Sequence, residues 1–72
     1  MTFIIFGNHA VNTVKITDMR YFSAMERSNG ETSTIWTLLI DMKDSQREEQ
    51  FYTEEECKKR MQEIVDILNK TN

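Results

Sequence analysis

Up to residue 52 the pattern of apolar and polar positions is that of β-strands, and in several segments it alternates with a period of two. The clearest example is the segment 32–43. One face of this strand would carry four large apolar side chains: Trp36, Leu38, Ile40 and Met42. Thr37 and Asp41 are polar residues on the other face, which is therefore expected to be partly exposed to solvent. We therefore expect this strand to lie at the centre of a sheet.

Three earlier segments also have strand character. Phe3–Phe6 is short, aromatic and β-branched, and a second apolar set runs from Val11 through Val14 to Ile16. Met19–Met25 alternates again, but its phase differs from that of Ile16. This change of phase predicts a bulge or a break near residues 17–18.

Turn residues separate these segments. Asn29-Gly30 is the strongest turn signal, because both residue types accept the positive φ values of a tight hairpin. Gly7-Asn8 is a second turn, and residues 44–46 form a third. A short last strand, residues 48–52, follows the third turn.

The last twenty residues predict one amphipathic helix. Thr53 and Glu56 have the spacing of a capping box, and three glutamates in the first turn suit the helix dipole. Each glutamate precedes a cation by four residues, which favours the ion pairs Glu54–Lys58, Glu55–Lys59 and Glu56–Arg60. An apolar stripe recurs at helical spacing: Cys57, Met61, Ile64, Val65 and Leu68.

The order of elements predicts an α+β fold. We expect an antiparallel β-meander of four to five strands within residues 2–52, with one C-terminal helix over 53–70 packed on one face. The chain contains no proline and no Gly/Ser-rich linker, so residues 1–72 are expected to form a single domain.

Charge and composition narrow the function classes. The net charge is −3, and residues 1–52 hold five Lys/Arg against seven Asp/Glu, so the basic footprint of a nucleic-acid binder is missing overall. The apolar run Phe3–Phe6 is far too short for a signal peptide or a membrane span. The single cysteine excludes a disulfide within the chain and suits a reducing compartment. We expect a soluble cytoplasmic protein without membrane contact.

The residues of common active sites are scarce. His9 and Cys57 are the only histidine and the only cysteine, too few for a structural zinc site with four N or S ligands. Cys57 lies on the apolar stripe of the helix, where a packing role is expected. The two glycines are isolated turn residues, so there is no phosphate-binding loop. We expect no catalytic residue, no metal and no cofactor, and therefore no enzymatic activity.

Apolar residues on both faces of two strands suggest a second covered surface. Ile35 and Leu39 point away from the Trp36 face, and Phe3–Phe6 is apolar on both sides. A sheet covered on one side should be polar on the other. One interpretation is a strongly curved sheet that buries both faces within the chain. The other is a homodimer or partner interface, with four candidate residues: Ile4, Phe6, Ile35 and Leu39.

An alternative is a sheet that binds single-stranded nucleic acid, since aromatic rings flanked by cations bind bases without sequence preference. The candidate residues for such a face are Arg20, Tyr21, Arg27 and Lys43. Acidic residues such as Asp18 and Glu26 are interleaved with these cations and would repel phosphates.

We therefore interpret the chain as a small non-enzymatic protein-interaction module, which binds a protein partner or its own copy. Compact chains with few motifs are common among accessory and mobile-element proteins of bacteria. The sequence does not specify the partner or the biological role.

Overall fold

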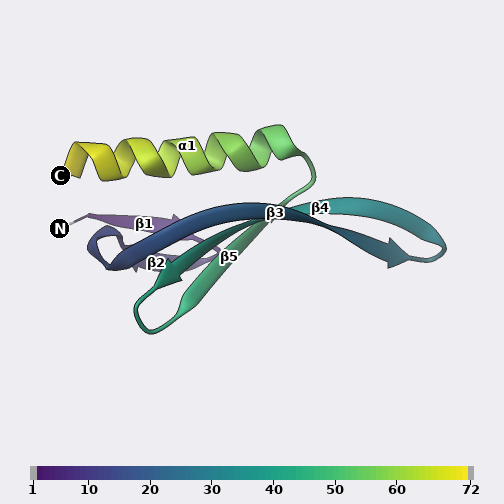
Figure 1. Ribbon diagram of the computed structural model, residues 1–72, viewed down its shortest axis with the longest axis horizontal. Helices are drawn as coiled ribbons and strands as arrows, with labels where there is room; N and C mark the ends of the chain where they lie inside the picture. Colours follow the sequence, from purple (N-terminus) through teal and green to yellow (C-terminus); the bar gives the residue numbers. More distant parts are fainter. Residues whose placement is uncertain (1, 72) are drawn as a thin grey trace.

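The computed structural model describes residues 2–71 and has the predicted α+β architecture (Figure 1). Its elements, in chain order, are β1 (Phe3–Phe6), β2 (His9–Asn12), the short 3₁₀ turn η1 (Thr13–Lys15), β3 (Ile16–Ser28), β4 (Glu31–Met42), β5 (Gln46–Phe51) and α1 (Glu54–Thr71). Strands β3, β4 and β5 form an antiparallel meander, whereas β1 and β2 form a separate two-stranded hairpin. The predicted helix is confirmed, and it starts and ends one residue later than expected.

Both predicted two-residue hairpin turns are present. Gly7 and Asn8 have φ values of 55° and 66°, and Asn29 and Gly30 have values of 53° and 80°. Two consecutive positive φ values define the turn whose twist matches that of the flanking strands. The pairs Phe6–His9 and Ser28–Glu31 close the two loops. The turn residues therefore fix the register of both hairpins.

The segment between β2 and β3 differs from the expectation of a continuous apolar strand. Residues 13–15 form η1, and Val14 is 75% exposed. The Asn12 side chain accepts a hydrogen bond from the Val14 N–H at 3.2 Å, and the Thr13 N–H donates to the Thr2 carbonyl at 3.0 Å. The chain therefore turns back at this point. The predicted irregularity is confirmed, because the β3–β4 register shifts between Ile16 and Asp18.

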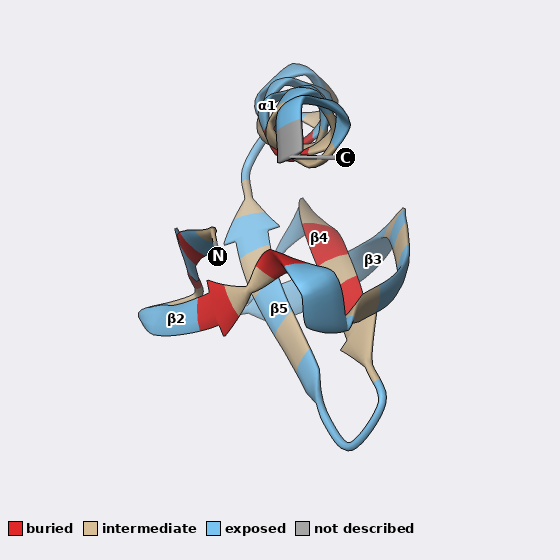
Figure 2. Ribbon diagram, turned by 90° about the vertical axis from the view of Figure 1, so that its left-hand side faces the viewer, coloured by how far each residue is buried: buried red, intermediate tan, exposed pale blue. Residues whose placement is uncertain are grey.

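One hydrophobic core lies on the face of the meander that α1 and the β1–β2 hairpin cover (Figure 2). The buried side chains come from all three parts of the fold: Ile4, Phe6, Val11, Leu38, Ile40, Cys57 and Ile64. Met61, Ile67 and Leu68 of α1 pack against this group, as do Trp36 and Met42 of β4. Four residues of the predicted helix stripe, Cys57, Met61, Ile64 and Leu68, therefore meet the predicted core face of residues 32–43, and Ile67 joins them in place of Val65.

The start of α1 follows the sequence prediction in part. The Thr53 hydroxyl accepts a hydrogen bond from the Glu56 N–H at 3.2 Å and donates to the Glu56 carboxylate at 3.2 Å. Glu54 pairs with Lys58 at 3.7 Å, as expected. The expected Glu56–Arg60 pair is wrong, because Arg60 turns toward the sheet.

Arg60 joins three elements. Its guanidinium donates a hydrogen bond to the Ile5 carbonyl of β1, and its Nε lies 3.3 Å from the Glu49 carboxylate of β5. It also lies over the Phe6 ring, 5.9 Å from the centroid. Because only 24% of the side chain is exposed, these contacts are partly shielded from water. Arg60 therefore links the helix, the hairpin and the last strand.

The hairpin turn approaches β5 so closely that Gly7 is required there. The Gly7 N–H donates to the Glu49 carboxylate at 3.2 Å. A Cβ atom at Gly7 would lie 2.5 Å from the Glu48 backbone oxygen, closer than real Cβ atoms come. The Glu49 carboxylate thus contacts both the hairpin turn and Arg60.

The β3–β4 hairpin extends well beyond the body of the molecule (Figure 1). Strand β5 pairs with β4 from Trp36 to Asp41, so the segment 31–35 pairs with β3 alone. We name the two segments 24–28 and 31–35 the arm. The arm gives the molecule principal extents of 46 × 24 × 18 Å. An isolated two-stranded ribbon of this kind is only marginally stable in water.

The two positive-φ glycines provide a matched test of this fold. Gly30→Ala should lower the free energy of unfolding by about 1 kcal/mol, since its loop has open space but requires positive φ. Gly7→Ala should lower it by at least about 1 kcal/mol more, because the new methyl group meets the Glu48 backbone. Urea unfolding followed by circular dichroism measures both. Equal losses would contradict the close approach of the hairpin turn to β5.

Candidate interaction surface

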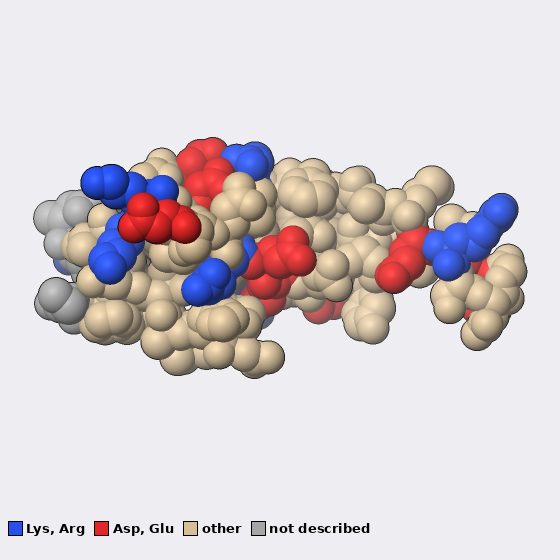
Figure 3. All heavy atoms as spheres, turned by 90° about the horizontal axis from the view of Figure 1, so that it is seen from below, with Lys and Arg blue, Asp and Glu red and all other residues tan. Residues whose placement is uncertain are grey.

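The face of the meander opposite α1 carries an apolar strip. Residues that pair directly across antiparallel strands share a face. Phe22 pairs with Thr37, Ala24 with Ile35, and Arg20 with Leu39, all on the side away from Leu38 and Ile40. We name this side of the sheet the open face, and its strip consists of five residues: Phe22, Ala24, Ile35, Thr37 and Leu39. The view from below the sheet shows uncharged side chains between the charged body and the charged tip of the arm (Figure 3).

The open face combines exposed and half-buried apolar side chains. Phe22 is 45% exposed, and Ile35 and Leu39 are half-buried among their neighbours. Thr37 is buried although no element covers this face among the described residues. The strip therefore presents a packed apolar surface rather than scattered side chains.

A polar cluster borders the strip at one end. Arg20 lies 2.5 Å from Asp41 and 3.2 Å from Asp18, and the Gln46 amide donates to Asp41 at 2.7 Å. The hydrogen bond from Arg20 to Asp41 raises the pKa of the Arg20 guanidinium, which stays charged in any case. These charged and amide groups pair with one another, and they form the polar border of the apolar strip.

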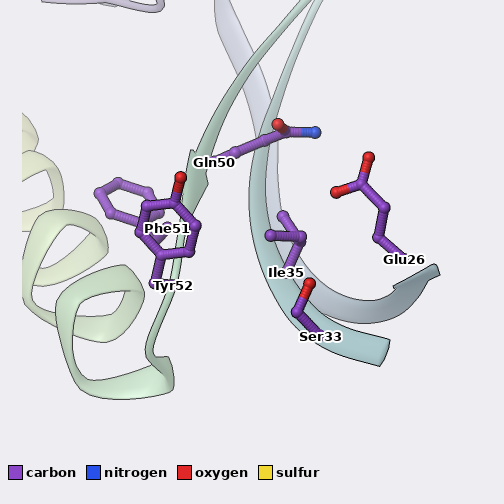
Figure 4. A pocket seen from close by; sticks show the side chains of 6 residues that line it. All are labelled: Glu26, Ser33, Ile35, Gln50, Phe51 and Tyr52. Atoms are coloured by element: carbon purple, nitrogen blue, oxygen red, sulfur yellow. The ribbon is translucent and has the colours of Figure 1, made fainter. Parts of the chain in front are cut away.

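An open pocket lies at the other end, where the arm leaves the body. It has a volume of about 450 Å³ and is lined by Glu26, Ser33, Ile35, Gln50, Phe51 and Tyr52 (Figure 4). Ile35 forms part of its wall between Gln50 and Ser33. Tyr52 is 81% exposed. The pocket therefore continues the open face toward an exposed aromatic ring.

The predicted interface residues separate into two groups. Ile35 and Leu39 lie on the open face, as the alternation indicated. The expectation that Ile4 and Phe6 belong to an outer surface is wrong, because they are 6% and 0% exposed in the core. The hairpin folds over the meander and turns these two side chains inward. Its outward apolar residues are Phe3, 55% exposed, and Ile5, 66% exposed.

The predicted nucleic-acid residues do not form one surface. Arg20 lies on the open face and binds Asp18 and Asp41, whereas Tyr21 lies on the covered face, 6.1 Å from Trp36 between ring centroids. Arg27 lies near the tip of the arm, and Lys43 follows the opposite end of β4. The aromatic ring and the cations that would bind a single strand are therefore on different sides and ends of the sheet.

Sequence reasoning missed Phe22 and Ala24, although a signal for both existed. A two-residue Asn29-Gly30 loop places Phe22 opposite Thr37 and Ala24 opposite Ile35 by counting back along both strands. Phe3, Ile5 and Tyr52 had no such signal, because their exposure depends on how the hairpin and the helix connection fold over the core.

The single cysteine of the sequence is part of the core, as its place on the apolar stripe of the helix predicted. Cys57 is fully buried, and burial raises the pKa of its thiol, with smaller contributions from Glu54 and Glu49. His9 lies exposed at the start of β2. Among residues 2–71, no three His, Cys, Asp or Glu side chains are grouped to hold a metal ion. No helix in the same range is long and apolar enough to cross a membrane.

Comparisons with family models, with characterised proteins and with solved structures found no match for this chain.

The buried thiol gives a pH-dependent prediction. Burial raises the pKa of Cys57 in the folded state above its ordinary value of 9.0. When the pH exceeds that ordinary value, the folded thiol keeps its proton and the unfolded thiol does not, so unfolding releases a proton. The contribution of Cys57 to the free energy of unfolding should therefore fall as the pH rises past about 9. Urea unfolding between pH 7 and pH 10, compared with the Cys57→Ala variant, measures it, since the other titrating groups are shared. Identical pH dependence in the two proteins would show that Cys57 titrates normally.

Proposed function

We propose that this chain is a small non-enzymatic protein-interaction module that binds a protein surface with its open face and also associates with its own copy. The observation that carries this proposal is the apolar strip on the uncovered side of the meander. Phe22, Ile35 and Leu39 lie together there, although the open side of a sheet covered by one layer is ordinarily polar.

The arrangement of the strip supports a contact surface. Its apolar centre is bordered by the Arg20–Asp41 pair at one end and by Glu26 at the other. An apolar centre with a polar rim is the usual anatomy of a protein–protein interface. Contiguous exposed apolar surface marks interaction sites in small proteins more often than scattered residues do.

The ionic groups of the chain support a structural rather than a catalytic role. Glu49 is engaged by Arg60 and by the Gly7 N–H, and Asp41 by Arg20 and Gln46. The Cys57 thiol is enclosed in the core, with its pKa raised. Glu49, Asp41 and Cys57 therefore contribute to the fold through these contacts.

The proposal predicts that charges on the open face abolish protein capture. A tagged Ile35→Lys/Leu39→Lys variant should retain partner proteins from a lysate of the native host at least about tenfold less than the wild type, since each apolar side chain contributes about 1.5–3 kcal/mol when fully buried. Quantitative mass spectrometry of the retained proteins measures the difference.

The matched control is Thr34→Lys, which adds a lysine at an exposed position of the arm on the opposite face. It should retain the same proteins as the wild type. Circular dichroism verifies that all three proteins are folded. An identical set of retained proteins for the wild type, the control and the double variant would contradict binding by the open face.

A further inference from the structure

Strand β3 is a long edge strand with nothing on its outer side among the described residues. It spans thirteen residues, Ile16–Ser28, and stands at one end of the β3-β4-β5 order. From Phe22 to Ser28 every residue is exposed. An uncovered edge of this length presents a row of free backbone N–H and C=O groups, which is a template for pairing with another strand.

The hairpin register determines which residues present these groups. Ser28 and Glu31 flank the two-residue loop and form the first pair of the ladder. Hydrogen-bonded and non-hydrogen-bonded pairs alternate from that point along an antiparallel ladder. The even-numbered residues of β3 therefore direct their backbone groups to β4. The odd-numbered residues, with Ser23 midway along the exposed part, direct theirs outward.

We propose that two copies of this chain pair their β3 strands antiparallel about a two-fold axis at Ser23. The result is one continuous six-stranded sheet, in the order β5-β4-β3-β3-β4-β5. This inference rests on the self-association in the proposed function and specifies its surface. A two-fold axis requires each copy to use the same strand, so the sequence of β3 must be complementary to itself when reversed.

The charges of β3 have this complementarity in the register centred on Ser23. Arg20 then stands directly opposite Glu26 of the second copy, and Glu26 opposite Arg20 of the second copy, on the open face. Arg20 remains available for this contact, because its side chain is 51% exposed and a guanidinium has five N–H donors. Opposite charges at directly paired positions stabilise a sheet.

The two neighbouring registers lack this match. Centred on Phe22, the pairing would place Asp18 opposite Glu26 of the second copy, so that like charges repel at both ends. Centred on Ala24, it would place Phe22 opposite Glu26. Directly paired residues must lie on the same side of the sheet, so the centre of the pairing moves along β3 by one whole residue at a time. The charges therefore select Ser23 as the centre among these three.

The uncharged side chains also fit the Ser23 register. On the open face, Phe22 stands opposite Ala24 of the second copy, so that a large ring lies against a small side chain. On the other face, Tyr21 stands opposite Met25, a residue 79% exposed in the single chain. Sulfur–aromatic contacts of this kind are favourable. Each arm thereby gains a third strand, and the two open faces join into one larger surface.

A charge exchange tests the register. Arg20→Glu and Glu26→Arg should each weaken self-association by about tenfold or more, measured by sedimentation over roughly 1 µM to 1 mM, because each places like charges at both paired positions. An equimolar mixture of the two variants should recover the wild-type association, since both pairs are then Glu–Arg. Loss of the Arg20–Asp41 contact within one chain cannot produce this recovery. A mixture that associates no better than either variant alone would overturn the proposal.

A cross-link gives a second readout that does not depend on these charges. Ser23→Cys should form a disulfide-linked dimer under mild oxidation, because the two residues are direct partners at the two-fold axis. The control is Ser28→Cys, whose two thiols would lie roughly 33 Å apart in this register. The wild type, with Cys57 buried, provides the baseline. Equal cross-linking of the two variants would overturn the register.

The outcomes separate this inference from the proposed function. If Ser23→Cys fails to cross-link while Ile35→Lys/Leu39→Lys loses its captured proteins, the edge pairing is wrong and the open face remains the binding surface. If Ser23→Cys cross-links and the captured proteins are unchanged, the edge pairing stands and binding by the open face is wrong.

Discussion

Coverage of a single face is the constraint on which the rest of this structure depends. Helix α1 and the β1–β2 hairpin both pack on the Leu38 face of the meander, where their apolar side chains share one core and Arg60 links them. Arg60 reaches the Ile5 carbonyl and Glu49 from the helix, while Gly7 brings the hairpin turn against the same glutamate. Both covering elements, α1 and the β1–β2 hairpin, therefore lie on one side of the meander. Within residues 2–71, no layer covers the opposite side of the meander or the arm.

Because the chain is small, covering only one face of the sheet limits the stability of the fold. A core of this size supplies only about 3–5 kcal/mol of net stability, and two strands that extend beyond it add little. The arm nevertheless carries Met25 and Ile35, and Phe22 lies beside it; these are side chains that gain by leaving water. A second surface would stabilise the arm and cover these residues together. This is the physical reason for interpreting the molecule as a binding module.

The sequence predicted those features that depend on local chemistry. The Asn29-Gly30 turn, the Thr53 cap and the alternation around Leu38 each follow from residue type and spacing, and all three are confirmed. The irregularity between Ile16 and Asp18 was also visible as a change of phase.

Features that depend on the relative placement of elements were not predictable in the same way. Phe3–Phe6 is apolar on both sides, so its pattern could not show that Ile4 and Phe6 turn inward while Phe3 and Ile5 turn outward. Arg60 has a suitable partner within the helix at Glu56, and only the packed structure reveals its preference for Glu49. Of the candidate interface, Ile35 and Leu39 were found because their strand is central and regular.

Amide hydrogen exchange measured by NMR at low and at high protein concentration tests most directly whether the free edge of β3 pairs with a second copy. It distinguishes backbone groups bound within the chain from those left free at the uncovered edge. If β3 pairs with β3 of a second copy, the amides of Tyr21, Ser23 and Met25 should exchange quickly in dilute solution and slow markedly on concentration. The amides of Phe22 and Ala24, which face β4, should change little. Exchange rates of Tyr21, Ser23 and Met25 that are the same at both concentrations would contradict the pairing of β3 between copies.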